Sequence, residues 1–191
     1  AHRGDARRQG ATARRARARL IGIVRRLVYL ADTLTDTVGG VAASLVIPLF
    51  LIMGYEVFAR FLLDLPTFWA YELAYMITGA HFVMGIAYVT KMRQHIRVDF
   101  LYTNFPVRVQ AAIDGIIYFF FLLPVSAWIS WRLGTVAYEA FLIGEVSGES
   151  AWNPLVWPLR TVVAFGYALF TLQTLAEAVK SYRTVVGADE V

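Results

Sequence analysis

Histidine is the residue whose position in this chain could support cofactor chemistry. His81 lies near the middle of the uncharged segment ITGAHFVMG, where an imidazole can bind haem iron or relay protons. A typical membrane cytochrome supplies two axial ligands, yet His81 is the only histidine within an apolar segment, so one chain cannot form a bis-histidine site. Gly79, Ala80 and Gly85 would let another helix approach closely. We therefore interpret His81 as a packing residue, with a metal ligand or proton relay as the alternative.

Opposite charges flank a short link between two apolar segments. Glu56 and Arg60 are four residues apart and share one face of a helix, and Glu72 follows a link that contains Pro66 and Trp69. One interpretation is an ion pair between Arg60 and Glu72 across the resulting hairpin. The alternative is that these charges reach independently into lipid headgroups, because each lies within a turn or two of the expected membrane boundary.

A polar elbow, KMRQHIRVDF at residues 91–100, separates two of the most hydrophobic parts of the chain. Its cations can set the orientation of the protein in a membrane, but orientation requires neither a histidine nor an aspartate. His95 and Asp99 are four residues apart and share a face if the elbow is helical. We expect them to hydrogen-bond to each other or to a partner subunit, and the alternative is a solvated loop.

Residue patterns that mark catalytic and metal sites are absent from the sequence. It contains no P-loop, no H-E-x-x-H, no G-x-S-x-G and no cluster of carboxylates. It also contains no cysteine, which excludes a disulfide framework, a thiolate metal site and a cysteine nucleophile. We therefore expect no catalytic residue, no metal and no cofactor, and we do not expect the chain to be an enzyme.

The elements that position these side chains are apolar segments of membrane-spanning length. Of the 191 residues, 58% are hydrophobic and 17% are charged, which is more apolar surface than a soluble domain of this size can bury. With its flanking aromatic or long basic side chains, each uncharged run reaches the roughly 20 residues that cross a hydrocarbon core. Pro48 and Pro124 lie mid-span and predict kinks. The sequence predicts an all-α integral membrane protein with four transmembrane helices on the runs 38–55, 73–90, 115–131 and 161–176.

The N-terminal segment is basic and precedes the first span. Nine arginines fall within residues 1–26, although the net charge of the chain is only +4. We expect Arg25 and Arg26 to contact anionic phospholipid and expect no nucleic-acid partner, because apolar spans follow this segment rather than a groove-reading fold. The expected organisation is a basic, disordered arm (1–19), an interfacial amphipathic helix (20–36), a four-helix transmembrane domain (37–180) and a cytoplasmic tail (181–191).

Loop charges predict the orientation in the membrane. Loops rich in lysine and arginine stay in the cytoplasm. The N-terminal segment, the 91–108 region and the C-terminal tail carry such residues, whereas the 134–154 loop has three glutamates and no balancing cation. An even number of spans keeps both ends on one side. We therefore predict that both termini are cytoplasmic.

Three segments occur in a distinctive order: YEVFARFLLDLPTFWAYELA, GIAYVTKMRQHIRVDFLYTNFPVRVQ and LRTVVAFGYALFTLQTLAEAVK. In this order they resemble the small membrane subunit of tripartite ATP-independent periplasmic (TRAP) transporters, over about residues 38–180. In that family an arginine closes the first span, a tryptophan and a glutamate open the second, and an H-I-x-V-D elbow precedes a proline. The matching positions are Arg60, Trp69, Glu72, His95, Ile96, Val98, Asp99 and Pro106.

The resemblance implies a division of labour among three components. A periplasmic substrate-binding protein would capture the solute, commonly an organic acid, and a large membrane subunit would carry the substrate and sodium sites. The chain would be a non-catalytic small permease subunit in the bacterial cytoplasmic (inner) membrane, packed against the static scaffold of the large subunit. The residues expected at subunit contacts are Arg60, Trp69, Glu72, His95 and Asp99.

Two other functions are consistent with the residues themselves. One is a membrane anchor subunit of a respiratory oxidoreductase, which would need haem or quinone. The other is a small transporter that self-assembles and uses an intramembrane glutamate. A haem absorbance band would favour the first, and transport by a homo-oligomer of this chain alone would favour the second.

Overall fold

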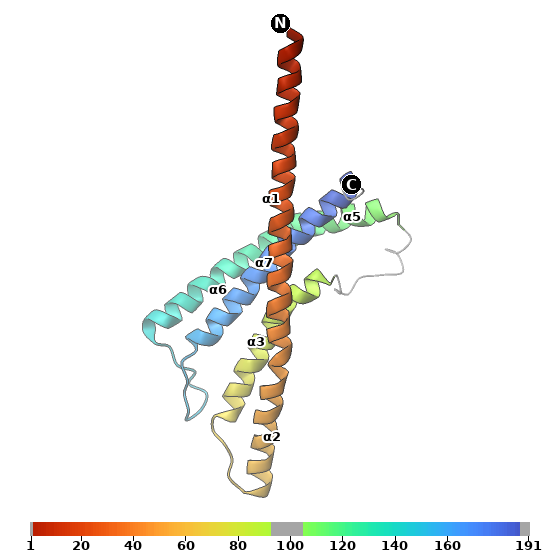
Figure 1. Ribbon diagram of the computed structural model, residues 1–191. Coiled ribbons are helices and arrows are strands. Elements are labelled where there is room, and N and C mark those ends of the chain that lie inside the picture. The colour runs from red at the N-terminus through yellow and green to blue at the C-terminus, as the bar shows by residue number, and fades with distance from the viewer. Residues whose placement is uncertain (1, 93–104, 188–191) are drawn as a thin grey trace.

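The computed structural model describes residues 2–92 and 105–187, with side chains from residue 21 onward. Within these residues the regular structure is helical, apart from one isolated antiparallel bridge between Val146 and Leu155. The described helices that are long and apolar enough to cross a membrane are Ile21–Leu62, Ala70–Lys91, Val107–Ile143 and Trp157–Val186. The predicted all-α fold with four membrane-spanning helices is therefore confirmed (Figure 1).

The first of these stretches is divided by a short turn. Helix α1 spans His2–Ser44 and α2 spans Val46–Leu62, with Leu45 between them. Pro48 explains the interruption, because its ring carries no N–H and clashes with the carbonyl four residues earlier. At the turn the Leu45 N–H donates to the carbonyl of Ala42, only three residues earlier, at 3.1 Å.

α1 continues through the segment that was predicted to be a disordered arm. The helix has no break at residue 19, where the arm was expected to meet an interfacial helix. Alanine and arginine dominate the arm and are strong helix formers, so its composition favours this continuation. The stretch Ile21–Leu62 has 42 residues, about twice the length that crosses a hydrocarbon core. Part of it must lie outside the hydrocarbon, and the interfacial helix at 20–36 stays a prediction.

The third stretch contains a π-helical segment. It consists of α5 (Val107–Ile116), the π-helix η1 (Ile117–Leu122) and α6 (Leu123–Ile143). The first residue of α6 donates its N–H to the carbonyl of Tyr118, five residues earlier. Pro124 follows immediately. The wider turn accommodates a residue that cannot donate a backbone hydrogen bond.

α6 extends beyond the predicted end of the third span. The uncharged run ends at Trp131, but the helix continues to Ile143, and the loop predicted from residue 134 begins only after it. Arg132 and Glu139 interrupt the apolar pattern without interrupting the helix, since both residue types are good helix formers. The helix ends at Gly144, whose φ of 62° is the left-handed conformation that glycine adopts readily.

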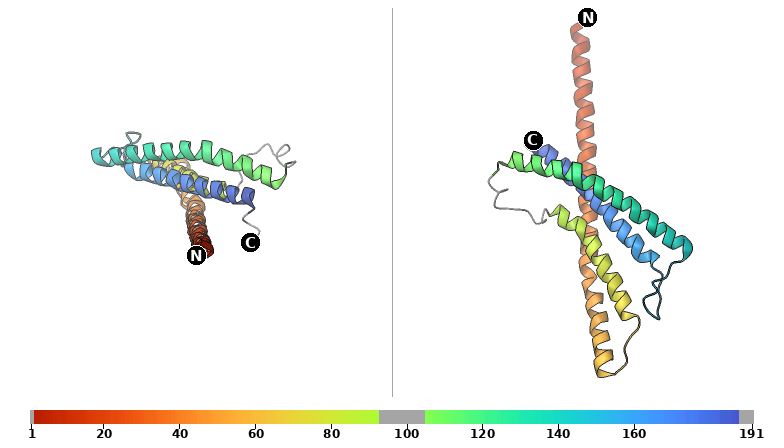
Figure 2. Two further views of the ribbon diagram at one scale, coloured as in Figure 1. Left: turned by 90° about the horizontal axis from the view of Figure 1, so that it is seen from above. Right: turned by 180° about the vertical axis from the view of Figure 1, so that it is seen from behind.

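α7 lies at the centre of the bundle. It spans Trp157–Val186 and packs against α6, against α5, against α3 (Ala70–Lys91) and against α1. Seen from above, α6 and α1 lie on opposite sides of α7 (Figure 2). α7 comes close to α3 at Gly166, where an added β-carbon would lie 2.5 Å from Val83 Cγ1. Small residues therefore allow the central helices to approach each other, as in other membrane bundles.

Large apolar side chains cover the outside of the bundle. Phe61 is 78% exposed, Phe50 74% and Trp131 72%. In water, patches of this kind would favour association. In a membrane, lipid tails or partner helices cover them without cost, so the surface agrees with the membrane-spanning assignment.

Candidate functional site

A cluster of five side chains, named here the polar cluster, joins α1 to α7. Lys180 Nζ lies 2.7 Å from Asp32 Oδ1 and 2.6 Å from Glu177 Oε1. Gln173 Nε2 donates to the same Asp32 oxygen at 2.9 Å and to Glu177 Oε1 at 3.2 Å. The Thr35 hydroxyl donates to Gln173 Oε1 at 2.8 Å. The five side chains therefore hydrogen-bond to one another, with one ammonium group between two carboxylates.

Helix periodicity brings the polar cluster together. Gln173, Glu177 and Lys180 are four and three residues apart on one face of α7, and Asp32 and Thr35 are three apart on α1. Glu177 is only 1% exposed, and a carboxylate buried to that degree is stable only with a partner. Within residues 2–92 and 105–187, no group of three or more potential ligands could hold a metal ion. Through these bonds the cluster fixes α1 against α7.

The polar cluster was missed in the sequence. Glu177, whose side chain is buried and paired with Lys180, is not singled out in the sequence analysis. The signal was present in the spacing of Gln173, Glu177 and Lys180, which puts three polar side chains on one face of an otherwise apolar helix.

A second contact joins α1 to α3. Lys91 Nζ lies 2.5 Å from Asp36 Oδ1 and 3.3 Å from the carbonyl oxygen of Asp32. Lys91 is the last residue of α3, and Asp36 follows Asp32 by about one turn of α1. Asp36 therefore binds α1 to α3, and Asp32, one turn earlier, binds α1 to α7.

Glu56 organises the outer end of α2, which is the end that meets the short link to α3. Its Oε1 accepts a hydrogen bond from Arg60 Nε at 2.8 Å, and its Oε2 accepts bonds from the N–H, at 3.1 Å, and the hydroxyl of Thr67. The predicted ion pair between Arg60 and Glu72 is not formed. Arg60 instead bonds to the carboxylate one turn earlier on its own helix.

Glu72 holds the loop between α6 and α7. The Ser147 hydroxyl donates to Glu72 Oε2 at 2.6 Å, and Glu72 is 3% exposed. The loop forms a small hairpin in which the Ser147 N–H donates to the Pro154 carbonyl at 2.9 Å. An ion pair closes the hairpin, in which Arg160 Nη1 donates to Glu145 Oε2 at 2.5 Å and Arg160 Nη2 donates to Glu145 Oε1 at 2.6 Å. Glu72 is therefore buried against this loop rather than extended toward lipid.

His81 contacts the turn between α1 and α2. Its Nδ1 lies 2.7 Å from the carbonyl oxygen of Ala42. A carbonyl oxygen only accepts, so Nδ1 carries the proton in this contact. The same Ala42 carbonyl also accepts a hydrogen bond from the N–H of Leu45, the residue that separates α1 from α2. The contact joins two helices and supports the packing interpretation of His81.

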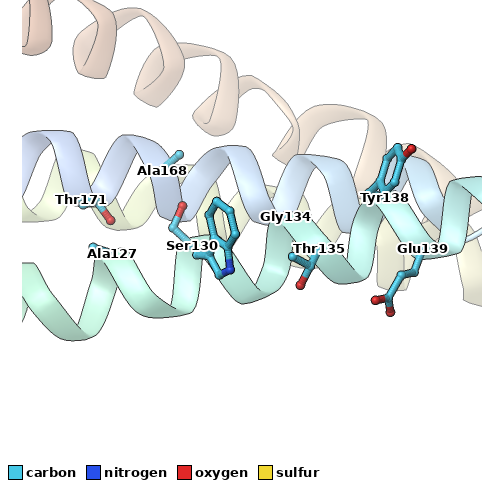
Figure 3. A pocket seen from close by; sticks show the side chains of 9 residues that line it. Ala127, Ser130, Gly134, Thr135, Tyr138, Glu139, Ala168 and Thr171 are labelled. Carbon is cyan, nitrogen blue, oxygen red and sulfur yellow. The ribbon is translucent and has the colours of Figure 1, made fainter.

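Two grooves that contain acidic or imidazole side chains open between helices of the described residues. The α6–α7 groove has a volume of 620 Å³ and contains Ser130, Gly134, Glu139 and Thr171 (Figure 3). The α1–α3 groove has a volume of 790 Å³ and contains Gly40, Gly85, His81 and Asp36. Glu139 is the acidic side chain in the lining of the first groove, which has no histidine. In the second groove His81 bonds to the Ala42 carbonyl and Asp36 pairs with Lys91. Neither groove assembles an acid–base pair.

Comparison with protein-family models identifies the family of the chain. The model of the tripartite ATP-independent periplasmic transporters, DctQ component, matches residues 49–184, well over half of the chain. The chain belongs to this family. A comparison with curated protein sequences returns no match.

Membership in the DctQ family establishes the general role of the chain. It is the small component of a TRAP transporter and a multi-pass protein of the inner membrane, and the family associates with a large membrane subunit and a binding protein. The matched residues begin in α2 and end in α7. The α7 side chains of the polar cluster therefore lie inside the match, and Asp32 and Thr35 lie outside it.

The hairpin between α2 and α3 brings together three of the positions that resemble family motifs. Arg60 bonds to Glu56, and Trp69 stacks on Tyr55 with ring centroids 6.0 Å apart and an interplanar angle of 23°. Glu72 lies in the first turn of α3 and bonds to the α6–α7 loop. These residues thus order the outer end of the first two spans.

The other predicted contact residues are on α1 and in the elbow. Arg25 and Arg26 are exposed on α1, as contact with lipid headgroups requires. His95 and Asp99 lie outside the described residues. Their contact with each other or with a partner stays a prediction.

Proposed function

We propose that this chain is the non-catalytic small permease subunit of a sodium-coupled, binding-protein-dependent secondary transporter. The supporting observation is how the chain uses its buried carboxylates. Glu56, Glu72 and Glu177 are buried, and each bonds to another residue of the chain, although Glu72 Oε1 has no hydrogen-bond partner among the described residues. A subunit that carried the transport site would instead present free polar groups to the ligand near the middle of the membrane.

The transport chemistry belongs, in this proposal, to the large subunit. That subunit carries the sodium and substrate sites, and the solute is an organic acid or a related small molecule delivered by the periplasmic binding protein. The chain packs against the static scaffold of the large subunit. Its internal bonding supports a static role, because the polar cluster and the Lys91–Asp36 pair hold α1 against two other helices.

The orientation in the membrane is also part of the proposal. We place both termini in the cytoplasm, with Arg25 and Arg26 against anionic phospholipid. Basic residues at the ends of α3 and α7 support this orientation, as does the acidic loop between α6 and α7 at the opposite ends of the spans.

Reconstitution tests the proposed function. The chain, the large subunit and the binding protein are purified and assembled with lipid vesicles, and uptake of a labelled organic acid is measured with and without a sodium gradient. We expect uptake only when all three proteins and the gradient are present. Uptake by the chain alone would contradict the proposal, and a Soret band in the purified chain would favour the respiratory anchor instead.

The polar elbow is proposed as a contact with the large subunit. His95→Ala and Asp99→Ala should each lower the recovered complex and the uptake together. Arg108→Ala is the control, because Arg108 is an exposed cation at the start of α5, outside the elbow. Lys91 is unsuitable as a control, since it pairs with Asp36 inside the chain. If both variants keep complex and uptake, the elbow is a solvated loop that only sets orientation.

A further inference from the structure

Gly134 is a glycine that the internal packing of the chain does not explain. It lies within α6, it is not among the residues with positive φ, and an added β-carbon would meet no atom within 4 Å. Gly166 is different, because a β-carbon there would collide with Val83. Glycine inside a helix is less stable than alanine, so an unneeded glycine calls for a reason. The space over Gly134 has no occupant among the described residues.

The surroundings of Gly134 have the composition of a contact between membrane helices. Ala127, Ser130 and Gly134 follow one another along α6, and Ala168 and Thr171 line the groove from α7. Ser130 points toward α7, whereas Glu139 points away from it (Figure 3). In membranes, small residues let helix backbones approach, and hydroxyl groups hydrogen-bond across the contact. The 620 Å³ groove therefore presents one side of such a contact.

Two unpaired charges adjoin the same groove. Glu139 lines it and Arg132 lies two turns earlier on α6; both are exposed, and neither has an ion-pair partner in the part of the chain that the structure describes. Arg132 is 11 residues before the end of α6 at Ile143, which is about 16 Å along a helix that rises about 1.5 Å per residue. A charge that lies within the hydrocarbon normally faces protein or water rather than lipid.

We infer that a membrane-spanning helix of the large subunit packs in the α6–α7 groove, with a basic side chain opposite Glu139 and a carboxylate opposite Arg132. This inference rests on the proposed function and names the face through which the chain meets its partner. Charge distinguishes this groove from the others. The groove between α5, η1 and α7 has no charged side chain in its lining. In the α1–α3 groove Asp36 pairs with Lys91 and His81 bonds to Ala42, so that groove leaves no charge for a partner to match.

Photo-crosslinking locates the partner directly. A benzophenone amino acid is placed at Thr135 in the α6–α7 groove or, as the matched control, at Val89 in the α1–α3 groove, and the chain is co-expressed with the large subunit. We expect at least tenfold more crosslinked large subunit from position 135 than from position 89. The reverse ratio, or no crosslink from 135 while the two subunits co-purify, overturns the inference. If the wild-type subunits do not associate at all, the proposed function fails and the inference fails with it.

Substitutions provide a second test on the same complex. Gly134→Leu fills the groove and Glu139→Lys reverses its charge, so each should lower the recovered large subunit at least tenfold. Gly85→Leu is the matched control, because Gly85 also has no atom within 4 Å of an added β-carbon but lies in the other groove. Its recovery should stay within twofold of wild type. Thermal unfolding of each chain purified alone separates lost contact from lost folding, and full recovery of the large subunit by folded Gly134→Leu and Glu139→Lys chains overturns the inference.

Discussion

His81 Nδ1 lies 2.7 Å from the carbonyl oxygen of Ala42 and so joins α3 to the turn between α1 and α2. Pro48 imposes this turn, because it cannot donate a backbone hydrogen bond within the first span. In a membrane no water replaces a lost backbone bond, so neighbouring side chains commonly supply one. The carbonyl that Pro48 leaves without its usual donor is that of Ser44, so His81 bonds to the neighbouring Ala42 carbonyl rather than replacing the lost bond.

Replacing His81 should reveal the contribution of this bond. His81→Ala should lower the free energy of unfolding by about 1 kcal/mol for the hydrogen bond, plus a packing loss. His81→Asn places an amide N–H near the position of Nδ1 and should recover part of that loss. Thermal unfolding of the detergent-solubilised chain, followed by circular dichroism, measures both. Equal losses in the two variants would mean that the N–H contributes nothing and that only volume matters.

Removing Lys180 should destabilise the contact between α1 and α7. Lys180→Ala leaves the carboxylates of Asp32 and Glu177 without their cation. Because the site is partly exposed, we expect the free energy of unfolding to fall by about 2 kcal/mol. Adding Glu177→Gln should restore part of it, because a neutral amide needs no counter-charge. Arg25→Ala is the control, since Arg25 is exposed. Thermal unfolding of single and double variants gives the coupling, and strict additivity would contradict the paired arrangement.

The fold could be predicted because hydrocarbon thickness constrains helix length. Uncharged runs of sufficient length identified all four spans. Their ends were less predictable, since a charged residue was taken as the end of a span. Arg132 and Glu139 show why this fails: α6 carries both charges on its exposed surface and continues to Ile143. Whether a charge ends a span depends on what faces it, and one sequence does not contain that information.

The side-chain partners were predictable only in part. Sequence spacing shows which residues share a helix face, as for Gln173, Glu177 and Lys180, but not which helix that face meets. Asp32 and Lys180 are 148 positions apart, so their contact depends on the packing of whole helices. Glu72 illustrates the same limit, because its partner Ser147 lies in a loop 75 positions away.

Enlarging Gly166 should separate α3 from α7. A β-carbon there would lie 2.5 Å from Val83 Cγ1 and 3.0 Å from the Val83 carbonyl oxygen, and the backbone oxygen cannot move aside easily. We expect Gly166→Ala to cost about 1–3 kcal/mol, as overpacking typically does. Gly79→Ala is the matched control, because its β-carbon would meet Leu159 at an ordinary 3.6 Å. Denaturation of both variants in detergent should show a lower free energy of unfolding for Gly166→Ala and an unchanged one for Gly79→Ala. Val83→Ala should rescue Gly166→Ala partially, since it removes the methyl clash but not the carbonyl clash.

Labelling of single cysteines should establish the orientation of the chain. The protein has no cysteine, so Ala151→Cys in the α6–α7 loop and Arg108→Cys beside the elbow each introduce one exposed thiol. Because the basic ends of α3 and α7 are expected in the cytoplasm, a membrane-impermeant maleimide added to intact spheroplasts should label residue 151 and not residue 108. Permeabilised spheroplasts should show labelling of both, which controls for reactivity. Ser181 cannot serve as the cytoplasmic position, because it is 0% exposed and its thiol would be shielded on either side. Labelling of 108 but not 151 in intact spheroplasts would place the termini in the periplasm and reverse the proposed topology.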